Sequence, residues 1–184
     1  MLAFDVHTGA TLDRVRGASQ IWFGPAGVPA LGLTTRGLAT LDFETLATLK
    51  RAERPGELLV DAAVSPTEFL VSSADASVSG VVASNLSCYT QDLRLLWNRR
   101  DESGTLTTRV AWDPSTESWL EVSSDPERVR QTQLIRLDRA GTELGRVRLA
   151  AEGDCRFILE GLALITDTCE VLDTRLGQRI VALC

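Results

Sequence analysis

The chain has 184 residues and a mass of 20.0 kDa, which corresponds to one domain of ordinary size. Its 44% hydrophobic and 24% charged residues can supply a packed core, and they exclude a disordered chain, a collagen and a coiled coil. The 25 acidic residues outnumber the 19 basic ones and give a net charge of −6. Nucleic-acid binding requires a basic field, so we expect no nucleic-acid partner.

Signals for metal binding, secretion and membrane insertion are missing from the sequence. His7 is the single histidine, so one chain cannot build a multi-histidine metal site, and we expect neither a metal nor a cofactor. Met1–Asp5 lacks the basic and apolar segments of a signal peptide, and no apolar run approaches the roughly 18 residues of a membrane span. The four cysteines lack Cys-x-x-Cys spacing and are interpreted as free thiols, with a disulfide as the alternative. We therefore expect a cytoplasmic protein without membrane contact.

Short segments rich in Val, Leu, Ile, Thr and Trp indicate an all-β chain. Clusters of Gly, Pro, Asp or Ser interrupt them roughly every 8–12 residues, the spacing that strands and turns produce. The best helix candidate is Ser124–Arg130, where a capping residue precedes Pro126 at the first helical position. It is too short to change the fold class.

The first half of an internal repeat is an apolar strand that ends in a turn, usually at a proline, followed by a second strand. The second strand ends in small or acidic residues. Successive copies are 41, 48 and 45 residues apart. The four copies are Ile21–Pro25 with Leu31–Thr35, Ala62–Pro66 with Phe69–Asp75, Val110–Pro114 with Trp119–Asp125, and the weaker Cys155–Leu159 with Leu162–Asp167.

The second half of the repeat is a hairpin with an acidic turn. It occurs at Phe4–Gly9, Leu41–Leu46, Tyr89–Leu93, Leu137–Gly141 and Leu172–Gly177. Two hairpins in a unit of ~40–45 residues give four strands, as in one blade of a β-propeller. We therefore predict an all-β, propeller-like fold of 18 strands in a single domain over 1–184. It has an N-terminal half-blade hairpin followed by four four-stranded blades at 18–54, 55–103, 104–151 and 152–184. A β-sandwich is the alternative.

These units resemble the blades of quinoprotein, YVTN and WD40-like propellers. Ala62–Asp75 and Val110–Asp125 are similar to the strand pair of those families. The hairpins are similar to the docking pattern Ala-x-Asp-x-x-Thr-Gly-x-x-x-Trp of quinoprotein blades: Trp97 matches its tryptophan, whereas Asp13 and Val181 replace it in other copies. The resemblance covers nearly the whole chain and implies a propeller, a fold that hosts many unrelated functions.

Three aspartates and three glycines of the acidic turns are expected to have a structural role. A short acidic side chain at the start of a turn accepts hydrogen bonds from the backbone two residues on, and glycine takes the positive-φ position. We assign this role, rather than a catalytic one, to Asp5 with Gly9, Asp138 with Gly141, and Asp173 with Gly177.

The four tryptophans have different expected positions. Trp112 and Trp119 align with Val64 and Phe69 and are predicted to pack between blades, and Trp97 matches the docking position. Trp22 aligns with alanines in the sister blades. We therefore expect it beside the incomplete blade or exposed at an interface.

Function is predicted from the architecture, because the sequence contains no phosphate-binding loop, nucleophile elbow or HExxH motif. We expect a non-enzymatic protein-interaction or scaffold module. A small-ligand or quinone-binding propeller, as a fragment of an enzyme, is the alternative.

The opening hairpin has no strand pair of its own, so we expect an interaction that completes the ring. The added strands come from a protein partner or a second copy, or this is the C-terminal part of a longer propeller. The residues expected at the interaction surface are Trp22, Phe4 and His7, the last interpreted as a solvated turn histidine.

Overall fold

The computed structural model contains 18 β-strands and no helix among the residues that it describes. These residues are 2–4, 11–14, 18–34, 36–54, 57–75, 83–101, 103–124, 132–149, 155–158, 163–165, 170–174 and 179–182. The predicted all-β class and strand number are confirmed. The candidate helix lies outside the described residues, except for Ser124, which ends a strand.

The strands form a two-stranded hairpin and four antiparallel four-stranded sheets, each built from consecutive strands. The hairpin pairs β1 (Leu2–Phe4) with β2 (Thr11–Arg14). Sheet 1 contains β3 (Ala18–Trp22), β4 (Ala30–Thr34), β5 (Gly37–Leu41) and β6 (Thr48–Glu53). Sheet 2 contains β7 (Glu57–Val64), β8 (Glu68–Asp75), β9 (Ser84–Thr90) and β10 (Leu95–Asp101). Sheet 3 contains β11 (Leu106–Asp113), β12 (Ser118–Ser124), β13 (Gln133–Leu137) and β14 (Glu143–Arg148). Sheet 4 contains β15 (Arg156–Ile158), β16 (Ala163–Ile165), β17 (Glu170–Asp173) and β18 (Arg179–Ala182).

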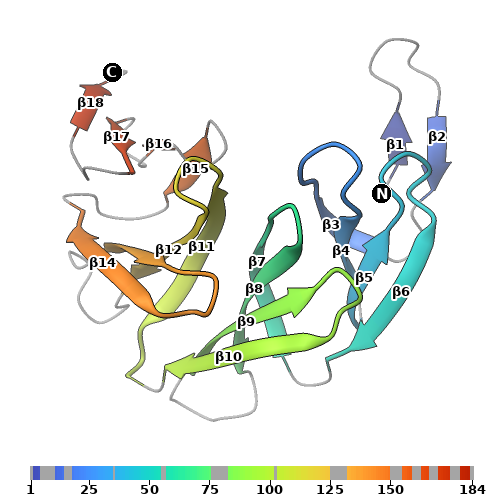
Figure 1. The fold of residues 1–184 in the computed structure, drawn as a ribbon, viewed down its shortest axis with the longest axis horizontal. Helices are drawn as coiled ribbons and strands as arrows, with labels where there is room; N and C mark the ends of the chain where they lie inside the picture. Colours follow the sequence, from blue (N-terminus) through green and yellow to red (C-terminus); the bar gives the residue numbers. More distant parts are fainter. Residues whose placement is uncertain are drawn as a thin grey trace.

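The sheets follow one another around an arc, with the hairpin at one end and sheet 4 at the other (Figure 1). The first strand of each sheet lies on the inside of the arc: β7 contacts both β3 and β11, and β11 contacts β15. The last strands, β6, β10 and β14, lie on the outside and are largely exposed. Within the described part of the chain the sheets do not close into a ring. The strands of each sheet fall inside the four predicted blade ranges, whereas the domain limits stay a prediction.

Three of the four core clusters described lie between neighbouring sheets, and the fourth, around Ala30 and Leu41, lies on sheet 1. Ala62 and Val64 of β7 pack toward sheet 1, together with Leu31 and Phe69. Ala63, between them in sequence, packs toward sheet 3. Successive side chains of a strand point to opposite faces, so a strand covered on both sides is apolar at consecutive positions. A further cluster, around Leu120 and Cys155, joins sheet 3 to sheet 4.

The tryptophans predicted to pack between blades occupy matching positions. Trp112 pairs with Trp119 across β11 and β12, and Val64 pairs with Phe69 across β7 and β8. The two indole rings meet edge to face at 4.7 Å, and Trp119 is completely buried. The predicted packing role is confirmed for Trp119, whereas Trp112 is only partly buried.

Trp97 of sheet 2 docks on the turn that joins β13 and β14 of sheet 3. Its Nε1 donates to the Arg139 carbonyl oxygen at 2.8 Å. Asp138 Oδ1 accepts from the amides of Ala140 and Thr142, and Gly141 has a φ of 84°. A Cβ atom on Gly141 would lie 2.9 Å from the Trp97 ring, so the turn needs glycine both for its backbone conformation and for this close approach. Asp138 and Gly141 therefore shape the turn against which Trp97 packs.

In the corresponding turns of sheets 1 and 2, leucine instead of glycine occupies the position with positive φ. Leu46 and Leu93 have φ values of 55° and 57°, which leucine adopts only at a conformational cost. Both side chains are buried, so their packing offsets this cost.

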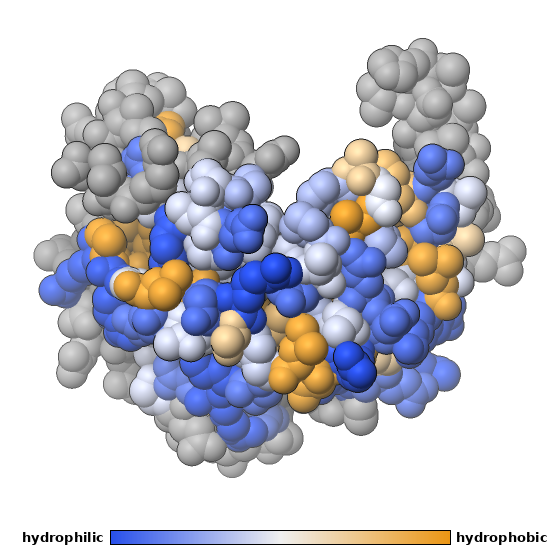
Figure 2. All heavy atoms as spheres, viewed as in Figure 1, coloured by the Kyte–Doolittle hydropathy of each residue, from blue (hydrophilic) through white to orange (hydrophobic). Residues whose placement is uncertain are grey.

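The outermost strands carry a bulge at equivalent positions. Leu49 of β6, Leu96 of β10 and Leu144 of β14 each lie where the pairing with the neighbouring strand shifts by one residue. A bulge interrupts the regular ladder of an edge strand and hinders edge-to-edge pairing with another chain. The three leucines are exposed, but the face seen in Figure 2 is mostly hydrophilic with small, separate apolar patches.

A buried ion pair fixes the inner hairpin of sheet 3. Asp113 is completely buried at the end of β11, and its Oδ2 accepts from Arg136 Nη1 at 2.7 Å. Its Oδ1 accepts from the Ser115 amide and hydroxyl, and Thr116 Oγ1 donates to Oδ2 at 2.8 Å. Although burial acts to raise the pKa of Asp113, the hydrogen bonds from Ser115, Arg136 and Thr116 lower the pKa to about 2.

Candidate binding site at the central channel

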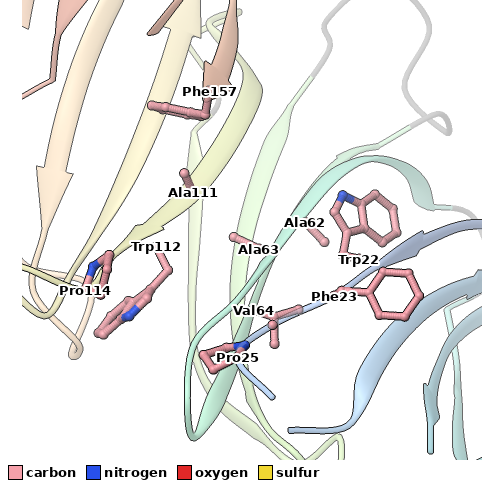
Figure 3. A pocket seen from close by; sticks show the side chains of 11 residues that line it. Trp22, Phe23, Pro25, Ala62, Ala63, Val64, Ala111, Trp112, Pro114 and Phe157 are labelled. Carbon is pink, nitrogen blue, oxygen red and sulfur yellow. The ribbon is translucent and has the colours of Figure 1, made fainter. Parts of the chain in front are cut away.

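The inner strands converge on an aromatic hollow of about 330 Å³. Its wall contains Trp22, Phe23, Pro25, Trp112, Pro114 and Phe157. Trp22 and Phe23 lie on one side and Trp112 and Pro114 on the other, across the short side chains of β7 (Figure 3). Sheets 1 and 3, with the turns that follow their first strands, therefore contribute apolar rings to one concave surface, and Phe157 adds a ring from sheet 4. Sheet 2 contributes only the short side chains of β7.

The turn after β3 sets the position of Phe23. A Cβ atom on Gly24 would lie 2.3 Å from Val64 Cγ1, so only glycine allows this turn to pack directly on β7. Phe23 keeps 57% of its surface exposed and meets Phe43 edge to face at 6.1 Å. An exposed phenylalanine held in one place by a neighbouring ring is suited to contact with a ligand.

Asp61 ties three sheets together beneath the aromatic hollow. It lies on β7, and its Oδ1 accepts from Trp22 Nε1 of sheet 1 at 3.1 Å. Its Oδ2 accepts from the Val110 amide of sheet 3 at 2.9 Å. Burial raises the pKa of Asp61, an effect that these hydrogen bonds and the charge of Arg109 oppose. The carboxylate therefore fixes the direction of the Trp22 indole.

A polar hollow of about 570 Å³ continues from the aromatic one, because Trp22, Ala62 and Phe157 line both. Its charged lining residues are Asp61, Arg109 and Arg156. Arg109 is partly buried and Arg156 is exposed. Among the described residues, two guanidinium groups and one carboxylate therefore line this part of the channel.

The structure brings only one of the predicted interaction residues to this site. We expected Trp22 beside the incomplete blade or exposed at an interface; it is partly buried, lines both hollows and packs toward sheet 2. Phe4 belongs to β1, and His7 lies outside the described residues. Their interaction role, and that of Trp22, stays a prediction.

The remaining predicted turn residues are only partly described. Asp173 is the last residue of β17. Its partner in the predicted turn, Gly177, lies outside the described residues, as do Asp5 and Gly9. The structural role predicted for these two turns is untested.

Sequence reasoning missed Asp61, Arg109 and Phe157. A single acidic residue interrupts the run Leu58–Val64, and this interruption was the available signal for Asp61. Trp112 was assigned to packing alone, whereas it both packs and lines the aromatic hollow.

The described residues supply little for redox or metal chemistry. They include no group of three His, Cys, Asp or Glu residues that could hold a metal ion. Cys88 and Cys155 are buried, and burial raises the pKa of the Cys88 thiol to about 12, which keeps this thiol protonated and unreactive. None of these residues forms a helix of the length and hydrophobicity needed to cross a membrane.

No family model and no curated protein matches this chain. Among solved structures, it is similar to the Pan2 WD40 domain of Neurospora crassa, with 12% identity and a TM-score of 0.65 over 95% of this chain and 53% of that one. It is also similar to the computationally designed Ika8 protein, with 15% identity and a TM-score of 0.62 over 98% and 54%. A europium-containing methanol dehydrogenase matches with 13% identity and a TM-score of 0.57 over 90% and 41%.

These likenesses confirm the predicted resemblance to propellers and the propeller-like fold. Identities of 12–15% show the fold alone and do not assign a function. The similar structures include both a WD40 domain and an enzyme. The chain spans about half the length of the Pan2 domain and of the designed protein.

Proposed function

We propose that this chain is a non-enzymatic protein-interaction module that binds a partner at the aromatic hollow. The observation that carries the proposal is the convergence of Trp22, Phe23, Trp112 and Phe157 on one concave surface. Aromatic residues in a partly desolvated pocket contribute most of the binding energy in protein interfaces. Inner strands hold Trp22, Trp112 and Phe157, and the turn after β3, packed on Val64, holds Phe23, so binding requires little reordering.

The test uses two exposed apolar residues as a matched pair. Phe23, in the hollow, and Leu144, on the outer strand β14, keep 57% and 60% of their surface exposed. We expect the wild-type chain and Leu144→Ser to capture the same proteins from a lysate of the native source. Phe23→Ser should fail to capture them. Equal capture by both variants would refute binding at the aromatic hollow.

A small ligand in the channel is the second candidate, and the size of the hollow favours it. A volume of about 330 Å³ lies within the range of roughly 300–1,000 Å³ typical of small-molecule sites. A compound that raises the melting temperature of the wild type and of Leu144→Ser, but not of Phe23→Ser, would favour this function, provided that the capture of no protein requires Phe23.

The open arc supports a second part of the proposal, that further blades complete the ring. An unpaired sheet at the end of an arc favours association with other strands. A second copy of the chain or a different protein would supply them. Light scattering on the 184-residue chain tests the first source: a mass of twice 20.0 kDa is expected, and a mass of 20.0 kDa excludes self-association.

A further inference from the structure

Two tryptophans from different sheets lie on opposite sides of the aromatic hollow, and they are held in different ways. Trp22 belongs to β3 of sheet 1 and Trp112 to β11 of sheet 3 (Figure 3). Trp22 Nε1 donates to Asp61 Oδ1 at 3.1 Å. Trp112 Nε1 is enclosed and has no hydrogen-bond acceptor among the described residues. Only the Trp22 ring is therefore oriented by a hydrogen bond.

Packing within sheet 3 holds the Trp112 ring. It meets the completely buried Trp119 edge to face at 4.7 Å. The Arg139 guanidinium lies over the Trp112 ring, 6.0 Å from its centre. These contacts fix this side of the hollow without a hydrogen bond from the indole.

The carboxylate of Asp61 connects the two sides of the hollow. Asp61 lies on β7 of sheet 2, and of the two hollows it lines the polar one. Its Oδ1 accepts from Trp22, and its Oδ2 accepts from the Val110 amide at 2.9 Å. Val110 precedes Trp112 by two residues on β11, about 7 Å along the strand. The position of Trp22 relative to Trp112 therefore depends on this one side chain.

The charge of Asp61 does not serve stability. Burial raises the pKa of Asp61, so its ionisation lowers the stability of the folded chain as the pH rises through that pKa. Proteins keep groups that lower stability chiefly where function requires them. A carboxylate has two acceptor oxygens for the two N–H donors, whereas an amide has only one. Holding both donors at once is the property that only the carboxylate supplies.

We infer that Asp61 is a positioning residue of the aromatic hollow: it holds Trp22 of sheet 1 at a fixed place relative to Trp112 of sheet 3, and the occupant binds this arrangement. Asp61 acts through Trp22 and not by contact with the occupant. The inference rests on the proposed binding at the aromatic hollow and names the residue that sets its shape.

Hydrogen exchange followed by NMR on the intact chain tests the geometry. We expect the Trp22 indole N–H and the Val110 amide to be protected in the wild type. Asp61→Asn offers one oxygen to two donors, so at least one of these protons should exchange about fivefold faster. Asp92→Asn, in the exposed turn between β9 and β10, is the matched control and should leave both exchange rates unchanged.

The binding probe is a decapeptide selected by the wild-type chain from a random phage library and not bound by Phe23→Ser. Trp22→Phe removes the indole N–H that bonds Asp61, whereas Trp112→Phe removes the one without an acceptor. Both variants lose ring area in the hollow, so Trp22→Phe should weaken peptide binding about fivefold more than Trp112→Phe does.

A double-mutant cycle separates positioning from a general effect on the fold. Asp61→Asn should weaken peptide binding about fivefold in the wild-type background and less than about twofold in the Trp22→Phe background, because the two side chains act as one unit. Asp92→Asn should bind the peptide as the wild type does. Circular dichroism of each variant confirms that the strands are intact.

Three outcomes would overturn the inference and leave the proposed function standing. Unchanged exchange in Asp61→Asn would show that the carboxylate does not hold the two donors. Unchanged peptide binding by Asp61→Asn would show that the position of Trp22 is unimportant. Losses of Asp61→Asn and Trp22→Phe that multiply would show that Asp61 does not act through Trp22. If no selected peptide depends on Phe23, the inference and the proposed function are both refuted.

Discussion

Replacing Asp113 by asparagine removes one charge from the most deeply buried ion pair among the described residues. Asp113 is completely buried, and Arg136 keeps 19% of its side chain exposed. Asparagine retains the shape and one acceptor for the Ser115 and Thr116 hydrogen bonds. The substitution therefore isolates the contribution of the charge to sheet 3.

The magnitude follows from the pKa of the carboxyl. A pKa of about 2 in the folded chain, against an ordinary 3.8, corresponds to about 2 kcal/mol of stability at neutral pH. The variant also leaves the Arg136 guanidinium without its counter-charge. We therefore expect the free energy of unfolding to fall by about 2–4 kcal/mol at pH 7.

The loss must depend on pH in a defined direction. Folding lowers the pKa of Asp113, so the stabilisation is fully present above 3.8 and disappears as the pH falls through the folded value of about 2. Between pH 7 and pH 3 the difference between wild type and Asp113→Asn should shrink by about 1 kcal/mol.

Urea unfolding followed by tryptophan fluorescence at pH 7, 5 and 3 measures both quantities. Trp112 and Trp119 lie in the same sheet and report on its loss. Glu117→Gln, at an exposed turn position nearby, is the control and should change the unfolding free energy little at any pH. A difference for Asp113→Asn that stays constant from pH 7 to pH 3 would show that this reasoning is wrong.

Other substitutions test the channel and the contacts between sheets. Burial raises the pKa of Asp61, so the wild type loses stability as the pH rises through that pKa. Urea unfolding should therefore show Asp61→Asn gaining stability relative to wild type from pH 3 to pH 7. This trend is opposite to the one expected for Asp113→Asn. Gly141→Ala should cost about 1–3 kcal/mol and shift the fluorescence of the displaced Trp97, because the new methyl group meets the ring at 2.9 Å; unchanged stability and emission would refute this. Trp97→Phe should cost about 1 kcal/mol in the same assay, through loss of the hydrogen bond to the Arg139 carbonyl; a neutral effect would contradict it. Cys88 should resist alkylation at pH 8 until the chain unfolds, as peptide mass spectrometry can show, because burial holds its pKa at about 12.

The sequence alone determined the strand content and the repeat. Turn residues and alternating apolar segments act locally, so the spacing of prolines and acidic turns was enough to predict a two-stranded hairpin followed by four groups of four strands. Equivalent positions in a repeat have equivalent neighbours. For this reason the alignment of Trp112 and Trp119 with Val64 and Phe69 already predicted that they pack between blades, and the two pairs occupy matching registers of their sheets.

Only the tertiary structure decided which of these residues form a site. Asp61 bonds Trp22 and Val110, which are 39 and 49 residues away in sequence and belong to different sheets. Strand periodicity divides side chains between two faces, but it does not say which face meets which neighbour or which strand lies on the inside of the arc. The sister repeats have alanine at the position of Trp22. Trp22 lies in the channel because sheet 2 packs against its side of β3, and Phe157 lines the same hollow because sheet 4 packs on sheet 3.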